Sequence, residues 1–312
     1  MVVEEGQRAD LAIRVAWLYH DRGLTQQEVA DRLGLSRSTV SRILTEAERD
    51  GLVRVVITRP LPETAALAES LIERYGLDGA AVGPALVDEP PGLAAARAMA
   101  RRLETLAASG RVTFAAGWGR TIAMSARETR QLPAGKVTIV DAFGHTSTDA
   151  TTAAVEVTNT LARKFDCKVM HVPSPGFVDS KEVADSFLST KPVKSTLKEA
   201  KAADLILVSI GIVGHESLLV REGFMSTEAM DEMVARGAVG EVFGRYYTAE
   251  GEPVPCPDVH PVALTMDDLR SADRVVAVAA GTEKTAAVKG ALAARVLDEI
   301  VVDETLAHAL LD

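Results

Sequence analysis

The chain has 312 residues, of which 47% are hydrophobic and 25% charged, and its formal net charge is −10 at pH 7. This length is enough for a small module plus a domain of roughly 250 residues with its own core, and no apolar run reaches the ~18 residues that span a membrane. Because the N-terminus is acidic and polar and the two cysteines, Cys167 and Cys256, form no CxxC pair, we expect no secretory signal and no disulfide framework, as in a reduced, cytosolic protein.

The first predicted element is an amphipathic helix over residues 8–22. Its inward positions are Leu11, Val15 and Leu18, with Trp17 and Tyr19 nearby. This helix would support a three-helix module, because two short helices follow it directly.

Residues 24–50 predict a helix-turn-helix. Thr25 can cap the first of its helices, Gly34 supplies the turn, and Ser36 can cap the second helix over residues 36–50. The second helix has an apolar stripe at i, i+3, i+4 and i+7, formed by Val40, Ile43, Leu44 and Ala47. The outward side chains at its start are short hydroxyls and arginines, which suit base edges and phosphates in a major groove. The predicted DNA-binding residues are Thr25, Gln26, Ser36, Arg37, Ser38, Thr39, Ser41 and Arg42.

A small helical hairpin with solvated arginines is the alternative reading of this segment. The complete order of cap, glycine turn, second cap and polar tip over an apolar stripe favours DNA binding. Residues 1–58 carry eight arginines, no lysine and nine acidic residues, whereas residues 32–54 carry five arginines and three acids. The acidic bulk of the chain would repel DNA, so we expect a separate, oriented module that acts as a dimer or tetramer.

The boundary of this module is predicted after a β-branched segment. Residues 52–58 indicate a short strand, such as a wing or an arm. Residues 59–62, with two prolines, then break the pattern. We therefore expect a DNA-binding domain over residues 1–58 and an effector and oligomerisation domain over residues 59–312.

From residue 63 onward, apolar strand-like segments alternate with helical ones. The predicted strands are Ala80–Val82, Val112–Ala116, Val137–Asp141, Lys168–Val172, Leu205–Ile210, Arg274–Ala280 and Glu299–Val302. The predicted helices include residues 92–109, 151–165, 193–202, 226–236 and 283–297. This alternation predicts an α/β domain with a doubly wound, mainly parallel sheet covered by helices on both faces.

Two glycine turns follow predicted strands and open helices, where ligands of parallel sheets bind. Residues 117–121 read Gly-Trp-Gly-Arg-Thr, and residues 281–284 read Gly-Thr-Glu-Lys. Glycines let backbone N–H groups approach an anion, the helix start adds its dipole, and Lys284 suits a phosphate. Each turn alone is also compatible with an ordinary strand–helix connection.

Over nearly its entire length the chain resembles the SorC/DeoR-type sugar-binding transcriptional regulators. The matching segments, in the family's order, are residues 24–44 with 51–53, 117–121, 203–205 leading to 210–212, 237–242, 275–281 with Lys284, and 302–304. The resemblance implies an effector domain folded like sugar-phosphate isomerases and deaminases, within a homotetrameric repressor or activator. It also implies that the turn at 117–121 and Lys284 contact a phosphorylated sugar.

The sequence departs from the family's pattern at three places. Residues 141–145 stand where some relatives carry a lysine that forms a Schiff base, so a covalent imine is not expected here. Glu241 replaces the family's usual aspartate and keeps its charge, and Val213 stands where a smaller or more polar residue is common.

The predicted effector contacts combine the two turns with three carboxylates and one further glycine. They are Gly117, Trp118, Gly119, Arg120, Thr121, Asp141, Asp204, Gly211, Glu241, Gly281 and Lys284. Among the carboxylates, Asp141 is preferred for sugar hydroxyls because it ends a strand at the expected edge. We expect no cofactor and no metal, since His20, His171, His260 and His308 show no metal-ligand spacing. His215, beside a glycine loop, is read as structural.

Three functions remain open at this point. The favoured one is a transcriptional regulator of carbohydrate metabolism whose operator binding responds to a sugar or sugar phosphate. The second is a sugar-phosphate isomerase or deaminase with an appended DNA-binding module. The third is a DNA-binding scaffold whose large domain only oligomerises. The missing imine lysine and the N-terminal module argue against the enzyme.

Overall fold

The computed structural model describes residues 10–53, 62–85, 89–90, 92–132, 136–146 and 154–312. The chain divides into two compact units, Met1–Pro60 and Leu61–Asp312, and each is described by itself. The predicted boundary between residues 58 and 59, and most of the predicted strand 52–58, lie outside the described residues. No described helix has the length and apolarity needed to cross a bilayer.

The first unit is a three-helix module. Residues 10–16 are helical and continue as η1 (Trp17–Asp21), a π-helical segment that precedes α2 (Gln26–Leu33) and α3 (Arg37–Arg49). The buried residues of the three segments form one core, made of Val15, Ala16, Leu18, Val29, Ala30, Val40, Ile43 and Leu44. This arrangement confirms the predicted helix-turn-helix, including the buried stripe of its second helix.

The two caps and the turn of this module have the predicted geometry. Thr25 and Glu28 form a capping box at the start of α2, and Gly34 ends that helix in the left-handed conformation at φ 66°. Ser36 caps α3, because its side chain accepts a hydrogen bond from Thr39 N. These local bonds satisfy backbone donors that a helix start would otherwise leave unpaired.

The second unit contains a seven-stranded sheet in the order β1-β13-β12-β6-β2-β3-β4. Every neighbouring pair in it is parallel. The strands are β1 (Gly79–Gly83), β2 (Val112–Ala116), β3 (Val137–Asp141), β4 (Lys168–Met170), β6 (Leu205–Ser209), β12 (Val275–Ala279) and β13 (Glu299–Asp303). Each of the seven predicted strands is present, although β4 ends two residues earlier than expected.

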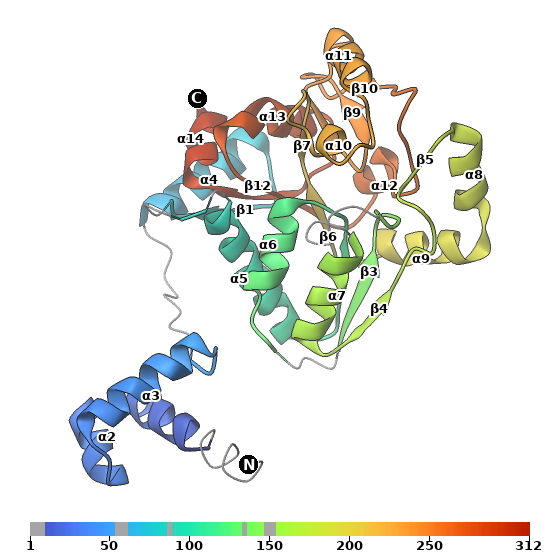
Figure 1. Ribbon diagram of the computed structural model, residues 1–312. Helices are drawn as coiled ribbons and strands as arrows, with labels where there is room; N and C mark the ends of the chain where they lie inside the picture. The colour runs from blue at the N-terminus through green and yellow to red at the C-terminus, as the bar shows by residue number, and fades with distance from the viewer. Residues whose placement is uncertain (1–9, 54–61, 86–88, 91, 133–135, 147–153) are drawn as a thin grey trace. The chain divides into compact units, whose positions relative to one another are not determined.

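Helices cover both faces of this sheet (Figure 1). On one face α5 (Leu93–Ser109), α6 (Arg120–Glu128) and α7 (Ala154–Phe165) pack on alternate strand residues such as Phe114 and Leu207. On the other face α4 (Pro62–Tyr75), α9 (Lys191–Lys201), α13 (Thr285–Ala293) and α14 (Glu304–Leu311) share a core with residues such as Ile206 and Val208. Two apolar faces per strand explain the near-continuous apolar segments of the sequence.

Smaller elements complete the second unit. A four-stranded antiparallel sheet has the order β10-β9-β8-β7, from β7 (Gly211–Ile212), β8 (Gly240–Val242), β9 (Arg245–Tyr247) and β10 (Pro253–Val254). β5 (Phe177–Val178) pairs with β11 (His260–Pro261). The short helices are α8 (Lys181–Ser189), α10 (Leu218–Arg221), α11 (Thr227–Ala235), α12 (Met266–Arg270) and the 3-10 turn η2 (Thr282–Lys284). The sequence did not predict the antiparallel sheet.

One predicted helix is shorter than expected. The segment 283–297 begins with η2 and ends at Ala293, because Arg295 takes a left-handed conformation at φ 55°. Val296 N then bonds back to Ala291 O, which closes the helix end in the manner of a Schellman turn. Of the predicted helix 151–165, residues 154–165 are described and helical.

Candidate functional site

The start of α3 presents the polar surface expected for DNA reading. Arg37, Ser38 and Arg42 are exposed, whereas Val40 between them is fully buried. Arg42 pairs with Glu46 one turn later, at 3.2 Å. This exposed pair contributes little to stability, about 0.3–0.5 kcal/mol for such helix pairs, so the Arg42 guanidinium can exchange Glu46 for a phosphate or a base.

The hydroxyls at the same helix start bond to one another. Ser36 Oγ lies 2.8 Å from Ser38 Oγ and 2.7 Å from Thr39 Oγ1. Thr39 and Ser41 are both partly buried. The hydroxyl of Thr39 therefore acts mainly within the cap. Thr25, Gln26 and Arg37 line one surface hollow together with Tyr19, Gly23, Leu24 and Gln27. The predicted DNA-binding residues thus lie on the two helix starts and the loop before α2.

A pocket of about 390 Å³ lies where β2, β6 and β12 end. Of the predicted effector residues, it brings together Trp118, Gly119, Arg120, Thr121, Gly211, Glu241 and Lys284. Its other lining residues are Gly92, Met124, Ser209, Ile210, Ile212, Glu216, Leu218, Phe243, Ala280 and Glu283. The two glycine turns, far apart in sequence, therefore reach the same cavity from neighbouring parts of the sheet.

Close packing explains the glycines of the first turn. A Cβ atom on Gly117 would lie 2.2 Å from the ring of Phe243, and one on Gly119 would lie 2.7 Å from Ser209. Gly119 also has φ 134° and begins α6 without a side-chain cap. The first-turn N–H groups of α6 therefore lie beside the pocket with no capping side chain, an arrangement that favours a bound anion.

Lys284 is one of the cationic side chains of the pocket lining. Its Nζ donates a hydrogen bond to Ile210 O at 2.7 Å, which fixes the side chain across the end of β6. Burial lowers the pKa of Lys284 to about 8, and the charge of Arg120 acts in the same direction against the opposing pull of Glu241 and Glu283. At pH 7 the amine of Lys284 is still mostly protonated. An anionic ligand would stabilise its positive charge.

Glu241 is buried at the floor of the site. One carboxylate oxygen, Oε2, accepts a hydrogen bond from Gly244 N at 2.7 Å. Burial raises the pKa of Glu241 to about 7, while the Gly244 bond and Lys284 partly oppose this. A carboxyl that changes protonation near neutral pH can accept or donate a hydrogen bond to a sugar hydroxyl.

Aromatic rings form one wall of the pocket. Trp118 stacks on Phe143 with ring centroids 5.7 Å apart, and contacts Phe177 and Phe224 edge-on at 5.6 and 5.8 Å. Phe143 also approaches Phe243 at 6.1 Å. Trp118 and Phe243 are both buried, and both belong to the pocket lining.

Two predicted carboxylates lie outside the pocket lining. Asp141 is fully buried and accepts hydrogen bonds from Thr158 Oγ1 at 2.7 Å and Val172 N at 3.2 Å, and it lies 2.9 Å from His171 Nδ1. Its carboxylate oxygens therefore connect the end of β3 to α7 and to the segment after β4. Asp204 precedes β6, so it lies at the amino end of that strand, where it accepts a bond from Thr113 N at 2.7 Å. The expectation that either carboxylate contacts the effector does not fit this geometry.

Other predicted residues act as supports. Gly117 N bonds to Leu207 O at 3.3 Å, and Gly281 N bonds to Asp303 Oδ1 at 3.1 Å, so both glycines position the turns rather than line the cavity. His215 is exposed and pairs with Asp231 at 2.8 Å, consistent with its structural reading, whereas its neighbour Glu216 does line the pocket.

Sequence reasoning missed several lining residues, including Ser209, Ile212 and Phe243. Ser209 is the last residue of β6, and Gly119 comes shortly after β2. A polar residue at the end of an apolar strand could therefore have indicated that Ser209 lies at the same edge of the sheet. Phe243 has φ 52° in the β8–β9 turn, a conformation that no sequence pattern indicated.

Residues 59–312 match the Sugar-bind family of sugar-binding domains, and residues 15–60 match the MarR family. The chain is 30% identical to the transcriptional regulator LsrR of Klebsiella pneumoniae over 99% of this chain and 97% of that protein. It is 28% identical to the erythritol catabolism regulatory protein EryD of Brucella abortus, over 96% of both chains. It is 26% identical to the deoxyribonucleoside regulator of Bacillus subtilis, over 98% of both.

Solved structures share this fold. The full-length sorbitol operon regulator SorC from Klebsiella pneumoniae superposes with a TM-score of 0.80 at 23% identity, over 97% of this chain and 99% of that chain. A DeoR family transcriptional regulator from Listeria monocytogenes gives a TM-score of 0.72 at 25% identity, over 79% of this chain and 99% of that chain. The predicted combination of a helix-turn-helix module with a doubly wound α/β domain is thereby confirmed, and the chain belongs to the SorC/DeoR-type family of sugar-binding transcriptional regulators.

Proposed function

We propose that the pocket at the ends of β2, β6 and β12 is the effector site, and that its ligand is a phosphorylated sugar. Binding of this ligand would change the affinity of the N-terminal module for operator DNA. The observation that carries the proposal is the meeting of Lys284 with the uncapped start of α6 in one pocket of about 390 Å³. Together they supply an ammonium group and backbone N–H donors, the two kinds of group that hold phosphates.

The rest of the pocket suits the sugar itself. Glu216, Glu241 and Glu283 offer carboxyl groups for hydroxyls, while Phe243, Ile212 and Leu218 offer apolar surface. Arg120, exposed at the start of α6, adds a second cation beside the phosphate position. A ligand with one anionic end and several hydroxyls matches this division of the lining better than a wholly apolar or wholly anionic one.

The decisive experiment screens sugar phosphates, their unphosphorylated parents and inorganic phosphate by thermal shift with the full-length protein. A ligand at 100 times its Kd stabilises the folded state by about 2.7 kcal/mol. We expect a sugar phosphate to raise the melting temperature more than its parent sugar does. Each hit is then tested for its effect on the binding of a DNA duplex that the protein itself selects from a random pool. If no sugar phosphate changes either property, the proposal fails. If the parent sugars also have no effect, the result favours a large unit that only oligomerises.

We further infer that the chain does not turn over its effector. The named relatives are regulators, and the segment 141–145 carries no lysine for imine chemistry. Incubation of the protein with each hit, followed by chromatography of the small molecule, checks this inference. Conversion of the ligand at a rate proportional to protein concentration would support an isomerase or deaminase instead.

We also propose that the protein acts as a homodimer or homotetramer built through the second unit. The net charge of −10 opposes DNA binding by a single module, so several modules should bind together. Light scattering on the full-length protein, with and without effector and DNA, measures the state directly. A monomer under all these conditions at micromolar concentration would contradict the proposal.

A further inference from the structure

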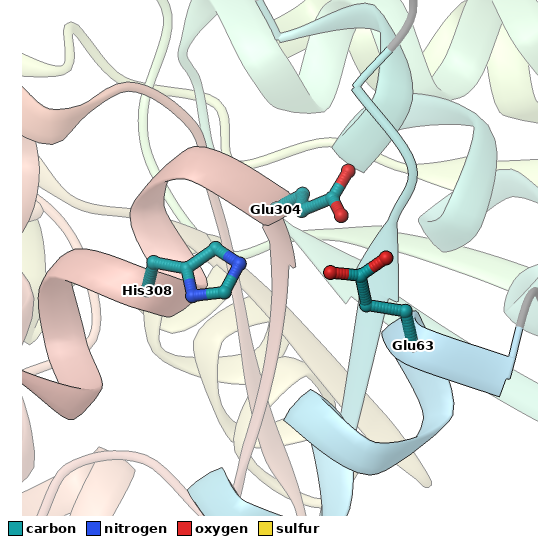
Figure 2. Close-up of side chains that lie close together, drawn as sticks. All are labelled: Glu63, Glu304 and His308. Carbon is teal, nitrogen blue, oxygen red and sulfur yellow. The ribbon is translucent and has the colours of Figure 1, made fainter.

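Three side chains of types that can bind a metal ion lie close together on the second unit, outside the lining of the pocket described above. Glu63 comes from the first turn of α4, and Glu304 and His308 come from α14. One ligand atom of each residue lies within 4.8 Å of those of the other two. Figure 2 shows the two carboxylates directed toward each other, with the imidazole on the neighbouring turn of α14.

The packing of two helices creates this cluster. Tyr75 Oη, at the end of α4, donates to Leu310 O at 2.5 Å, and Arg74 donates to Leu311 O. Because the ends of α4 and α14 are joined in this way and their starts also meet, the helices run side by side in the same direction. Glu304 and His308 are four residues apart, so they lie on one face of α14, toward the start of α4.

The described residues provide no basic ion-pair partner for the charges of this cluster. Among the described residues, none of the ion pairs involves Glu63, Glu304 or His308. Glu304 Oε2 accepts a hydrogen bond from Ala85 N at 3.1 Å, which orients the carboxylate and leaves Oε1 for another partner. Two carboxylates and an imidazole, with one carboxylate held in place, form a site suited to a cation.

We propose that Glu63, Glu304 and His308 bind a divalent transition-metal ion of the Zn²⁺ class. One imidazole with two carboxylates is a ligand set that such ions accept, whereas Mg²⁺ and Ca²⁺ prefer oxygen ligands alone. Around a tetrahedral Zn²⁺ at about 2.1 Å, neighbouring ligand atoms are about 3.4 Å apart. The side chains must therefore close in from separations of up to 4.8 Å. Glu63 and His308 are exposed and can make this rotamer adjustment, and water would complete the coordination.

The location gives the ion a structural consequence. Glu63 lies in the first turn of α4, directly after residues 54–61, which lead from the first unit into the second. An ion bound by Glu63, Glu304 and His308 would link the start of α4 to α14, the C-terminal helix of the second unit. Metal binding should then stabilise the second unit, because an ion that binds only the folded state adds its binding free energy to folding.

The test is calorimetric titration of ZnCl₂ into the chelator-treated, full-length protein and into His308→Ala and Glu63→Gln. We expect one Zn²⁺ per chain at this site in the wild type. Loss of even an outer partner of a metal ligand typically lowers affinity about 10–100-fold, so each variant should bind at least about tenfold more weakly. MgCl₂ under the same conditions should give far weaker binding.

The matched control is His215→Ala, which removes an exposed histidine that also lies beside a carboxylate but outside the cluster. It should bind Zn²⁺ like the wild type. Melting in the presence of chelator shows whether each variant folds, and added Zn²⁺ should raise the melting temperature of the wild type and His215→Ala only. The proposal is overturned if the wild type binds no Zn²⁺, or if His308→Ala and Glu63→Gln bind it with wild-type affinity.

Discussion

Gly211 and Glu241 are register partners on β7 and β8, and a Cβ atom on Gly211 would lie 1.9 Å from Oε1 of Glu241. The glutamate can occupy this site only because residue 211 has no side chain. With its carboxylate seated against Gly211, Glu241 also accepts the hydrogen bond from Gly244 N at 2.7 Å. This pair therefore fixes both the floor of the pocket and the turn that carries Phe243.

Gly211→Ala should destabilise the protein and displace Glu241. Moving Glu241 would leave the buried N–H of Gly244 without its hydrogen-bond acceptor, and an unsatisfied buried donor typically costs about 1–3 kcal/mol. We expect a loss of that size in the free energy of unfolding measured by urea denaturation. Gly79→Ala is the matched control, since its added Cβ would lie 3.4 Å from Cδ of Glu299, an ordinary contact. Equal losses of unfolding free energy in the two variants would show that the close fit of Gly211 to Glu241 does not contribute to stability.

The sheet could be predicted from the sequence because its strands are buried on both faces. β6 and β12, for example, are nearly continuous apolar segments, and the helices between them have a clear period. β7 and β10 have only two residues each, too few to show any alternation. They form because the segments on either side bring them together, which is a tertiary effect that local pattern cannot reveal.

The pocket was only partly predictable, for the same reason. A glycine turn after an apolar strand identifies the sheet edge, so Gly119 and Lys284 were correctly expected to lie near each other. Asp204 lies outside the pocket lining, and the sequence already indicates this position, because Asp204 precedes its strand and so belongs to the opposite edge of the sheet. Asp141 does end a strand, but its hydrogen bonds to Thr158 and Val172 N occupy it, and these partners could not be read from spacing.

Lys284→Met should remove most of the response to a sugar phosphate while leaving the fold intact. The substitution keeps the aliphatic stem and loses the ammonium, and hydrogen bonds to charged groups contribute about 1.5–3 kcal/mol, which corresponds to a loss of about 10- to 150-fold in affinity. Calorimetric titration of the best ligand measures the change.

Lys289→Met is the control for this substitution, because Lys289 is a partly buried lysine of α13 outside the pocket lining. It should bind the ligand like the wild type. If Lys284→Met also binds with wild-type affinity, the phosphate lies elsewhere or the true ligand has none.

Glu241 should make stability depend on pH below neutrality. Burial raises its pKa from 4.5 in the unfolded chain to about 7 in the folded one. Across that window the folded chain keeps a proton that the unfolded chain releases, so the contribution of Glu241 to stability is full below pH 4.5 and is lost as the pH rises through about 7. Glu241→Gln lacks this titration and should gain stability relative to the wild type as the pH rises.

Melting temperatures of the wild type and Glu241→Gln at pH 5 and pH 7.5 test this dependence. At the upper pH, Lys284 with its pKa of about 8 is still mostly protonated, so its contribution of the opposite sign is small. The difference between the two proteins should shift in favour of Glu241→Gln at the higher pH. Parallel curves would mean that Glu241 is ionised across the whole range.

Arg42→Ala should weaken binding to a DNA duplex selected by the full-length protein from a random pool. Arg42 is exposed on α3 and pairs with Glu46 at 3.2 Å, an exposed pair that its guanidinium can leave for the groove. A bidentate contact to guanine discriminates by about 1–3 kcal/mol, and we expect a loss of that size by fluorescence anisotropy. The double variant Arg37→Ala/Arg42→Ala should bind still more weakly.

Arg49→Ala is the control, because Arg49 pairs with Asp50 at the opposite end of α3. This substitution should leave affinity and sequence preference nearly unchanged. If the double variant protects the selected duplex like the wild type in a footprinting assay, α3 does not read DNA through its start.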